Sequence, residues 1–398
     1  MPPFHVFHLF ICAVNPFLSP MPRPFFFTMV VVVFCAGLFA VGLWPFNFRA
    51  KNHAMLSQDG AGLRFDAPVQ RSHQDLGGMV FTASPLSCRS KEGCEAATIS
   101  IALELRADNE PSGCIPRILE VRRPDGSEAF YLGQWESALI VRSFNTPAGG
   151  GKPYREMGVA GVLRPGRTSI IAITSGPGGT DFFLDGRKAE NFPGARLLRA
   201  DETLEGHSLY LGNSPNLSCP WAGSILALAL FSKAWTPLEA ISRQDGSAGS
   251  SLNCGNGRVD AIACYRFEGP AGEWIVDTSG SGNDLWKPGI LVFEKRFLGM
   301  PSMRSFPLSD LAVNLAGFVP FGFMVCLRLL IAKRLSARTC ILLSLAAGFA
   351  VSLGIETVQV WLPGRDSSMP DLLANSMGAF IGGAACFKAK RLWEVCLC

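Results

Sequence analysis

Residues 25–46 read FFFTMVVVVFCAGLFAVGLWPF and carry no charged side chain. An α-helix of this length crosses the hydrocarbon core of a bilayer, which is roughly 30 Å thick. Three more apolar segments lie near the other end of the chain, at about 311–332, 340–362 and 372–387. The last is rich in Gly, Ala and Ser, which is typical of a helix packed closely against other helices. The sequence therefore predicts an all-α bundle of four transmembrane helices.

A cleaved signal peptide is the alternative for the first segment, because an apolar stretch that follows a basic residue, here Arg23, also directs export. The length of the segment and its aromatic end, which places Trp44 at the membrane interface, favour a retained helix. Residues 1–20 fit no targeting class, and Met21 is an alternative to Met1 as the start of translation. Mapping the N-terminus distinguishes the two starts.

The positions of the basic residues predict the topology. Six of them lie between the second and third predicted helices or after the fourth, namely Lys333, Arg334, Arg338, Lys388, Lys390 and Arg391. Loops rich in Lys and Arg stay in the cytoplasm, so both termini are expected inside and residues 49–309 outside. Together with Glu394 these residues sum to +5, and the formal net charge is +4, so the rest of the chain is near −1. No basic face is left for nucleic acid, and no nucleic-acid partner is expected.

The overall composition excludes intrinsic disorder and makes a purely cytosolic enzyme an unlikely class. The chain is 48% hydrophobic and only 17% charged. A solvated coil cannot leave that much apolar surface exposed. We therefore expect a multi-pass membrane protein, with membrane lipids among its partners.

Residues 49–303 differ in character from the apolar segments and predict an exported all-β sandwich. Short runs of apolar or alternating residues recur, for example TISIALEL at 98–105, TSIIAI at 168–173 and ILAL at 225–228. Turn signals separate them, such as PDG at 124–126 and DG at 185–186. The predicted domains are 1–48 with the first helix, 49–303 with the sandwich, and 304–398 with the other three helices.

Cysteines in this exported segment are candidates for structural disulfides. The six are Cys88, Cys94, Cys114, Cys219, Cys254 and Cys264. An even number in an oxidising compartment fits a disulfide framework, but six cysteines allow 15 pairings. Cys88 with Cys94 and Cys254 with Cys264 are the nearest pairs along the chain. No His or Cys spacing indicates zinc, so no metal and no cofactor are predicted.

Several stretches of the β segment resemble the laminin G-like, concanavalin A-type jelly roll. They are FFLDGR at 182–187, LYLG at 209–212, WAGSILALALF at 221–231 and WTPLEA at 235–240. Residues 263–269 and 277–284 resemble the opening strand and loop of that family, but here they follow its closing strands, which indicates a rearranged strand order. The resemblance implies a binding module, often for carbohydrate and sometimes with calcium, although no residue pattern here supports calcium.

Tryptophans are the residues on which a carbohydrate-binding prediction depends. Exposed aromatic rings stack on the apolar faces of sugars, and Asn and Asp side chains bond their hydroxyl groups. The alternative is that the tryptophans of this segment pack in the core, and it applies to Trp135, Trp221, Trp235, Trp274 and Trp286. A glycosidase in the same sandwich would need two paired acids, and no such pair is present on one strand.

Polar residues inside transmembrane helices are costly, and this chain has a specific set of them. The set is Asp310, Asn314, Glu356, Gln359, Arg365, Asp371 and Asn375. Within each helix the spacing places two of them on one face. With the predicted topology, Asn314, Glu356, Gln359 and Asn375 lie roughly 5–9 Å below the outer ends of their helices. We expect either a functional polar site or hydrogen bonds that only hold the bundle together.

Glu356 fits the purely structural alternative poorly. A carboxyl at that depth must be protonated, paired or hydrated. Arg365 and Asp371 are its predicted neighbours.

The same positions resemble the VanZ-like membrane family. The resemblance rests on FVPFGF at 318–323, PGR at 363–365 and DLLANSMGA at 371–379, together with the polar set and PFNF at 45–48. It covers about 24–48 and 309–387, so the β-sandwich is an insertion in the first external loop. One departure is DSSM at 366–369. The family implies a polytopic envelope protein, named for its association with glycopeptide (teicoplanin) resistance, and implies no settled reaction.

Three functional hypotheses follow. In the first, the sandwich binds an envelope glycan or another surface ligand while the bundle handles or senses an envelope component. In the second, the chain is a membrane enzyme acting on lipid-linked or peptidoglycan intermediates, with Glu356 as general acid or base and Arg365 binding a phosphate or carboxylate. In the third, the bundle is a plain anchor that displays an adhesion module. Because the sequence contains no recognisable catalytic triad, metal site or nucleotide-binding loop, we favour the hypotheses in which the protein is not an enzyme.

Overall fold

The computed structural model describes residues 23–57, 62–66, 76–89, 94–111, 114–145, 153–242, 260–268, 272–300, 308–332 and 335–396. Met1, Met21, Cys254, Lys333 and Arg334 lie outside the described residues. The chain divides into two compact units. Residues 1–48 and 295–398 form one unit, and residues 49–294 form the other.

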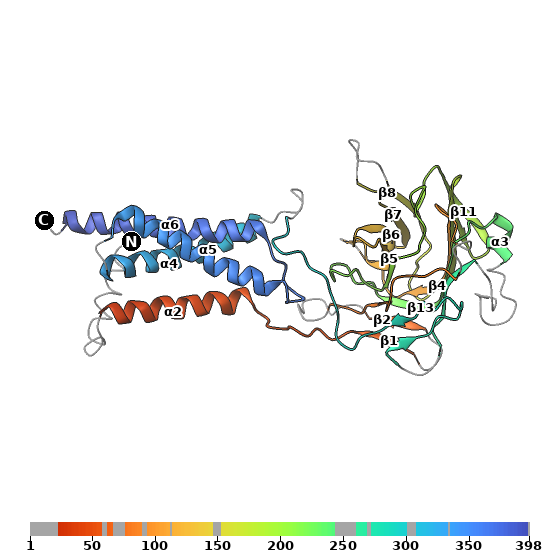
Figure 1. Ribbon diagram of the computed structural model, residues 1–398, viewed down its shortest axis with the longest axis horizontal. Coiled ribbons are helices and arrows are strands. Elements are labelled where there is room, and N and C mark those ends of the chain that lie inside the picture. Colours follow the sequence, from red (N-terminus) through yellow and green to blue (C-terminus); the bar gives the residue numbers. More distant parts are fainter. Residues whose placement is uncertain are drawn as a thin grey trace. The chain divides into compact units, whose positions relative to one another are not determined.

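The first unit contains four long helices (Figure 1). They are α2 (Arg23–Gly42), α4 (Leu308–Ala332), α5 (Ala337–Gln359) and α6 (Met369–Cys396). Each is long and apolar enough to cross a membrane, which confirms the predicted four-helix bundle of a multi-pass membrane protein.

Several helix bounds differ from the prediction by a few residues, and those of α5 and α6 have a clear local reason. Helix α5 ends at Gln359 and not at 362, because Pro363 follows and disfavours helical conformation in the residue before it. Helix α6 begins at Met369 and continues to Cys396, well past the predicted end at 387. The added part carries Lys388 and Lys390, which are good helix formers that end an apolar run without ending a helix.

Glycines set the packing of α4 against α6. A Cβ atom built on Gly322 would lie 2.0 Å from the carbonyl oxygen of Ala379. A Cβ on Gly378 would lie 2.3 Å from the oxygen of Leu315, and one on Gly382 would lie 2.0 Å from the oxygen of Val319. The two backbones therefore touch, as expected for a helix rich in small residues.

The second unit is a sandwich of two antiparallel sheets (Figure 1). The first sheet has the order β1 (Ala54–Leu56), β2 (Leu63–Phe65), β13 (Gly223–Phe231), β4 (Ile99–Ala107), β9 (Thr168–Gly176), β10 (Gly179–Leu184) and β11 (Arg187–Pro193), with β14 (Ala261–Arg266) paired to β13. The second sheet has the order β15 (Trp274–Ile275), β16 (Leu285–Trp286), β3 (Val80–Thr82), β12 (Ser208–Leu211), β5 (Arg117–Arg122), β6 (Glu128–Trp135), β7 (Ala138–Ser143) and β8 (Arg155–Val159). A short helix, α3 (Pro237–Ser242), follows β13.

The chain crosses repeatedly from one sheet to the other, which makes the unit a jelly-roll sandwich and confirms the predicted fold class. Strand β4 joins the first sheet, β5–β8 the second, β9–β11 the first, β12 the second and β13 the first. The sequence β14–β16 then follows β13, with β14 in the first sheet and β15 and β16 in the second.

The core lies between the sheets and is built from alternating strand residues. Trp221 is fully buried there, and its indole N–H donates to Oε1 of Gln134 (2.7 Å). Trp235 is buried as well, whereas Trp135 is partly exposed and Trp274 is 58% exposed. The tryptophans therefore divide between the core and the surface.

One ionic group is buried at the edge of this core. The Glu202 carboxylate pairs with Arg123 (2.6 Å) and with Nε2 of His207 (3.0 Å), and it accepts a hydrogen bond from the backbone N–H of Arg199 (2.9 Å). Burial alone would raise the pKa of Glu202, but the bonds from His207, Arg123 and Arg199 lower it to about 2. The carboxylate is therefore charged at neutral pH.

Candidate functional site

Glu356 lies at the end of α5 and holds the start of α6. Its side chain is 2% exposed, and Oε2 accepts a hydrogen bond from the backbone N–H of Ser368 (2.7 Å). Ser368 immediately precedes α6, so the carboxyl group faces a helix N-terminus, where unpaired N–H groups and the helix dipole favour an acceptor.

Gln359 and Arg365 bind the end of α2. Nε2 of Gln359 donates to the carbonyl oxygen of Gly42 (2.9 Å), and Nε of Arg365 donates to the carbonyl oxygen of Trp44 (2.9 Å). Both contacts join residues near position 360 to the first helix. The two parts of the bundle are therefore connected by polar bonds as well as by apolar packing.

Asp371 lies among the remaining predicted polar residues. Its electrostatic neighbours are Asn314, Asp310, Arg365 and Ser368, and it is itself the charged neighbour of Glu356. Of the two neighbours predicted for Glu356, Asp371 is thus the one that interacts electrostatically with its carboxyl group. Arg365 instead contributes to the surroundings of Asp371.

Asn375 lies one turn further along α6 and is buried. Its Nδ2 donates to Oγ of Ser352 on α5 (2.9 Å). Among the described residues, Oδ1 of Asn375 and Oε1 of Gln359 are buried without a hydrogen-bond partner. The structure therefore brings the seven predicted residues to one end of α4, α5 and α6, and leaves two acceptor oxygens there unused.

Sequence reasoning missed Lys295. This side chain is 4% exposed, and Nζ donates to the carbonyl oxygens of Leu362 (3.0 Å), Pro363 (2.6 Å) and Arg365, while it pairs with Asp366 (3.1 Å). Burial lowers the pKa of Lys295, and the charge of Asp366 opposes that change. Lys295 thus holds the α5–α6 loop, residues 360–368, in place.

Residues 298–299 continue this contact. The backbone N–H of Leu298 donates to Oγ of Ser367 (3.1 Å), and that of Gly299 donates to the Ser367 carbonyl (2.9 Å). Gly299 in turn accepts from the N–H of Met369 (3.2 Å). Residues 295–299, which we call the strap, therefore fix the loop that supplies the Ser368 N–H to Glu356. Residues 366–369, where the sequence departs from the VanZ-like pattern, are among those that the strap binds.

The outward face of the second sheet carries one continuous row of cross-strand partners. Each of the eight strands contributes one residue, and neighbours in the row are register partners. In strand order, from β15 to β8, the cross-strand row is Trp274, Trp286, Phe81, Tyr210, Glu120, Tyr131, Arg142 and Glu156.

The first half of the row is aromatic. The rings of Trp274 and Trp286 stack with centroids 6.5 Å apart, and Phe81 meets Trp286 edge-on at 5.4 Å. Phe81 then stacks on Tyr210 at 5.6 Å. Such contacts rigidify rings that would otherwise lose rotamer freedom on binding. Trp274 ends the row with its face largely in solvent.

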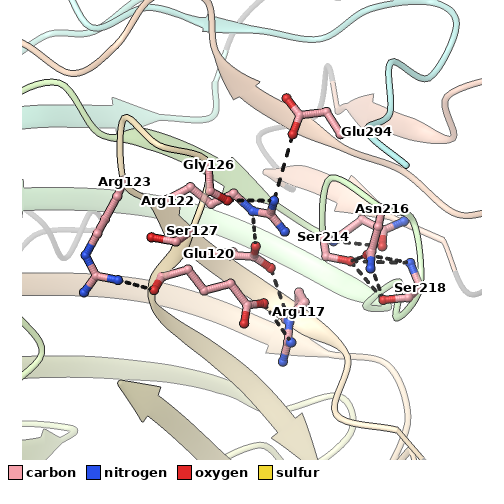
Figure 2. A network of polar contacts seen from close by, with 12 residues as sticks. Arg117, Glu120, Arg122, Arg123, Gly126, Ser127, Ser214, Asn216, Ser218 and Glu294 are labelled. Atoms are coloured by element: carbon pink, nitrogen blue, oxygen red, sulfur yellow. Dashed lines mark hydrogen bonds and ion pairs between the residues drawn. The ribbon is translucent and has the colours of Figure 1, made fainter. Parts of the chain in front are cut away.

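The second half of the row begins at Glu120, which lies among charged side chains (Figure 2). The buried Glu120 carboxylate lies between Arg122 (2.7 Å) and Arg117 (3.3 Å). The Arg117 guanidinium lies 3.2 Å from the centre of the Tyr131 ring. Burial raises the pKa of Glu120, and the charges of Arg122 and Arg117 oppose that change. Glu120 and Tyr131 are buried in this network, so Arg142 and Glu156 are the members of this half that reach solvent.

The loop at 277–284, which resembles the opening loop of the jelly-roll family, is filled by its own hydrogen bonds. The buried Asp277 carboxylate accepts from the N–H groups of Cys264 (2.8 Å), Ser279 (2.9 Å) and Asn283 (3.0 Å), and from Oγ of Ser279 (2.7 Å). A calcium ion needs six to eight oxygen ligands, and this carboxylate has little left to offer. In the described part of the chain, no group of three or more His, Cys, Asp or Glu side chains is placed to hold a metal ion.

Three of the predicted cysteines are in disulfides. Cys88 is bonded to Cys94, and Cys264 is also disulfide-bonded. Cys114 and Cys219 are free thiols in the structure. The predicted disulfide character of the domain is therefore confirmed at Cys88, Cys94 and Cys264.

Residues 275–391 match the VanZ/LLP1 family model. This segment is a VanZ-like domain. The match begins in β15, ahead of the helices, and includes the strap and the α5–α6 loop as well as α4, α5 and most of α6. The comparison with curated proteins finds no match.

Solved structures resemble the chain over its sandwich at low identity. One is a candidate carbohydrate-binding protein from Bacteroides ovatus, with a TM-score of 0.37 and 14% identity over 61% of this chain and 59% of that one. Another is the CBM40 of Ruminococcus gnavus IT-sialidase bound to α2,3-sialyllactose, with a TM-score of 0.31 and 12% identity over 41% of this chain and 91% of that one. A third is the heptameric SAP-like pentraxin of Limulus polyphemus, with a TM-score of 0.34 and 10% identity over 48% and 85%. The assignment of the sandwich to the laminin G-like family stays a prediction.

Proposed function

We propose that this protein is a multi-pass protein of the cell envelope whose jelly-roll domain lies outside the cytoplasm and binds a glycan along the cross-strand row. The observation that carries the proposal is the exposed Trp274, stacked on Trp286 at the head of that row. An exposed, pre-ordered indole pair is costly on a solvated sheet face unless it meets an apolar ligand surface, such as the C–H face of a sugar ring.

The rest of the row supports the same ligand class. Seven steps between neighbouring strands, each of about 4.8 Å, separate the exposed Trp274 from the exposed Glu156 by about 34 Å, and the buried Glu120 and Tyr131 lie between them. Arg142 and Glu156 at the far end form an ion pair (2.6 Å) that offers polar groups to hydroxyls. A rigid row also reduces the entropy lost on binding.

An extracytoplasmic position of the sandwich is part of this proposal. It is supported by the basic residues in the C-terminal part of α6, Lys388, Lys390 and Arg391, and by disulfides in the sandwich, because disulfides persist in oxidising compartments. In that position the sandwich would meet glycans of the cell envelope.

The VanZ-like domain has a separate role in the proposal, which is to handle or sense an envelope component at the outer ends of α4, α5 and α6. The partly exposed Asp371, beside Asp310 and Asn314, and the unused oxygens of Asn375 and Gln359 supply polar groups for a headgroup. We also propose a link to teicoplanin resistance, which rests on the VanZ-like domain at residues 275–391. It is tested by the susceptibility of cells that carry Asp371→Asn in place of the natural chain.

Glycan binding is tested with the full chain in detergent on an array that includes peptidoglycan fragments and envelope polysaccharides. We expect binding that Trp274→Ala weakens at least tenfold, since loss of one stacked ring costs on the order of 1.5 kcal/mol. Met55→Ala is the matched control, because Met55 is 49% exposed but lies on β1 of the other sheet. Equal binding by the two variants, or no binding by the natural chain, contradicts the proposal.

A further inference from the structure

Two thiols of the sandwich lie against each other although they are distant in the sequence. Cys114 precedes β5 and Cys219 precedes β13, and their side chains are within hydrogen-bonding reach of each other. Both are free thiols in the structure. Neither belongs to the apolar core of the sandwich.

The backbone already holds these two segments side by side. The N–H of Arg117 donates to the carbonyl oxygen of Cys219 (3.0 Å), and Arg117 pairs with Pro220 in an isolated parallel bridge. Forming a bond would bring the two sulfurs from hydrogen-bonding distance to about 2 Å, between segments that the backbone already pairs.

We propose that Cys114 and Cys219 form a disulfide in the mature protein, which ties the start of β5 to the turn before β13. The same domain already contains the Cys88–Cys94 bond and a disulfide at Cys264. Where two disulfides form, a third pair of adjacent thiols meets the same oxidising conditions. The proposal does not rest on glycan binding.

The chemistry is thiol–disulfide exchange with a donor disulfide of a thiol oxidant. The thiolate of Cys114 attacks one donor sulfur, which forms a mixed disulfide and releases one donor thiolate. Cys219 then loses its proton and attacks the Cys114 sulfur, which releases the second donor thiolate. Two protein thiols are oxidised and one donor disulfide is reduced to two thiols, so electrons and protons balance.

Cys114 is the better attacking group of the pair. The hydrogen bond from Cys219 lowers the pKa of the Cys114 thiol to about 7, with a smaller contribution from the positive charge of Arg117, although burial opposes both. A substantial fraction is then thiolate at neutral pH. Cys114 is also exposed, so a donor disulfide can reach it, whereas Cys219 is half-buried.

The bond would fix a turn that adjoins the cross-strand row. Figure 2 shows the side chains of Ser214, Asn216 and Ser218 gathered in this turn. Oγ of Ser218 donates to Oδ1 of Asn216 (2.8 Å), and Oγ of Ser214 bonds the same amide oxygen. Cys219 directly follows this hydrogen-bonded turn, and Arg117 lies three residues after Cys114, so the crosslink would hold both sides of the network.

The test is a thiol map of the full chain. Cells are quenched with N-ethylmaleimide before lysis, and the purified protein is digested and analysed by mass spectrometry without reduction. We expect a crosslinked peptide pair containing Cys114 and Cys219, with neither residue alkylated. In Cys114→Ser, Cys219 becomes alkylated while Cys88 and Cys94 remain bonded, which separates the pairing from misfolding.

Two results overturn the proposal. One is alkylation of Cys114 and Cys219 in a chain whose Cys88–Cys94 bond is intact. The second result concerns cells in which Cys88 and Cys94 are alkylated too, so that the Cys88–Cys94 bond has not formed there. The purified chain is then oxidised with glutathione disulfide, and formation of Cys88–Cys94 without Cys114–Cys219 refutes the pairing. Array binding by Cys114→Ser is a separate readout, so the fate of the glycan proposal does not decide this one.

Discussion

Replacing Gly322 with alanine should separate α4 from α6. The added Cβ would lie 2.0 Å from the Ala379 oxygen, whereas an ordinary contact begins at 3.4 Å, so the helices must part locally by about 1.4 Å. A gap of 0.5–1 Å already removes a quarter to a half of each dispersion contact. Because packing is the main force between transmembrane helices, we expect a loss of about 2–3 kcal/mol.

Gly317→Ala is the matched control in the same helix. A Cβ on Gly317 meets nothing within 4 Å, so alanine there should be neutral or stabilise by up to about 1 kcal/mol through its higher helix propensity. The unfolding free energy is measured on the full chain by titrating dodecyl sulfate into a mild detergent. Alkylation rates of the buried Cys326 on α4 and Cys386 on α6 report helix separation independently.

The reasoning is refuted if the two variants unfold within about 0.5 kcal/mol of each other. It is also refuted if Gly322→Ala is destabilised while Cys326 and Cys386 stay as protected as in the natural chain. In that case the loss would not come from separation of α4 and α6.

Two further predictions concern buried charges. Lys295→Met leaves three loop carbonyls without their donor and should cost about 3 kcal/mol, with faster proteolysis in residues 360–368, whereas the exposed Arg296→Met should change neither. The pKa of Glu202 is about 2 in the folded chain, so its pairing with Arg123 and His207 stabilises the fold above the unfolded pKa of about 4.3 and is lost as the pH falls towards 2. Glu202→Gln should remove about 3 kcal/mol at pH 7 and flatten the fall in melting temperature between pH 5 and pH 2, and an unchanged pH profile would contradict that assignment.

The sequence by itself determined which segments enter the membrane and which form strands. The run at 25–46 and the small-residue segment that became α6 are recognisable because hydrophobic length and residue size are local properties. Strand alternation at 98–105 is local in the same sense, and it became β4. The polar spacing of Asp371 and Asn375 likewise needed only the helical period to place both on one face.

Only the tertiary structure decided which distant residues meet. The cross-strand row joins Phe81 to Trp286 and Tyr210 to Glu120, and such a row depends on the register between strands from opposite ends of the domain, which no local pattern encodes. The partners of Lys295 are backbone carbonyls, and every residue has one, so its sequence neighbours carry no sign of the contact. The pairing of Cys114 with Cys219 was one option among many until the bridge at Arg117 placed the two thiols together.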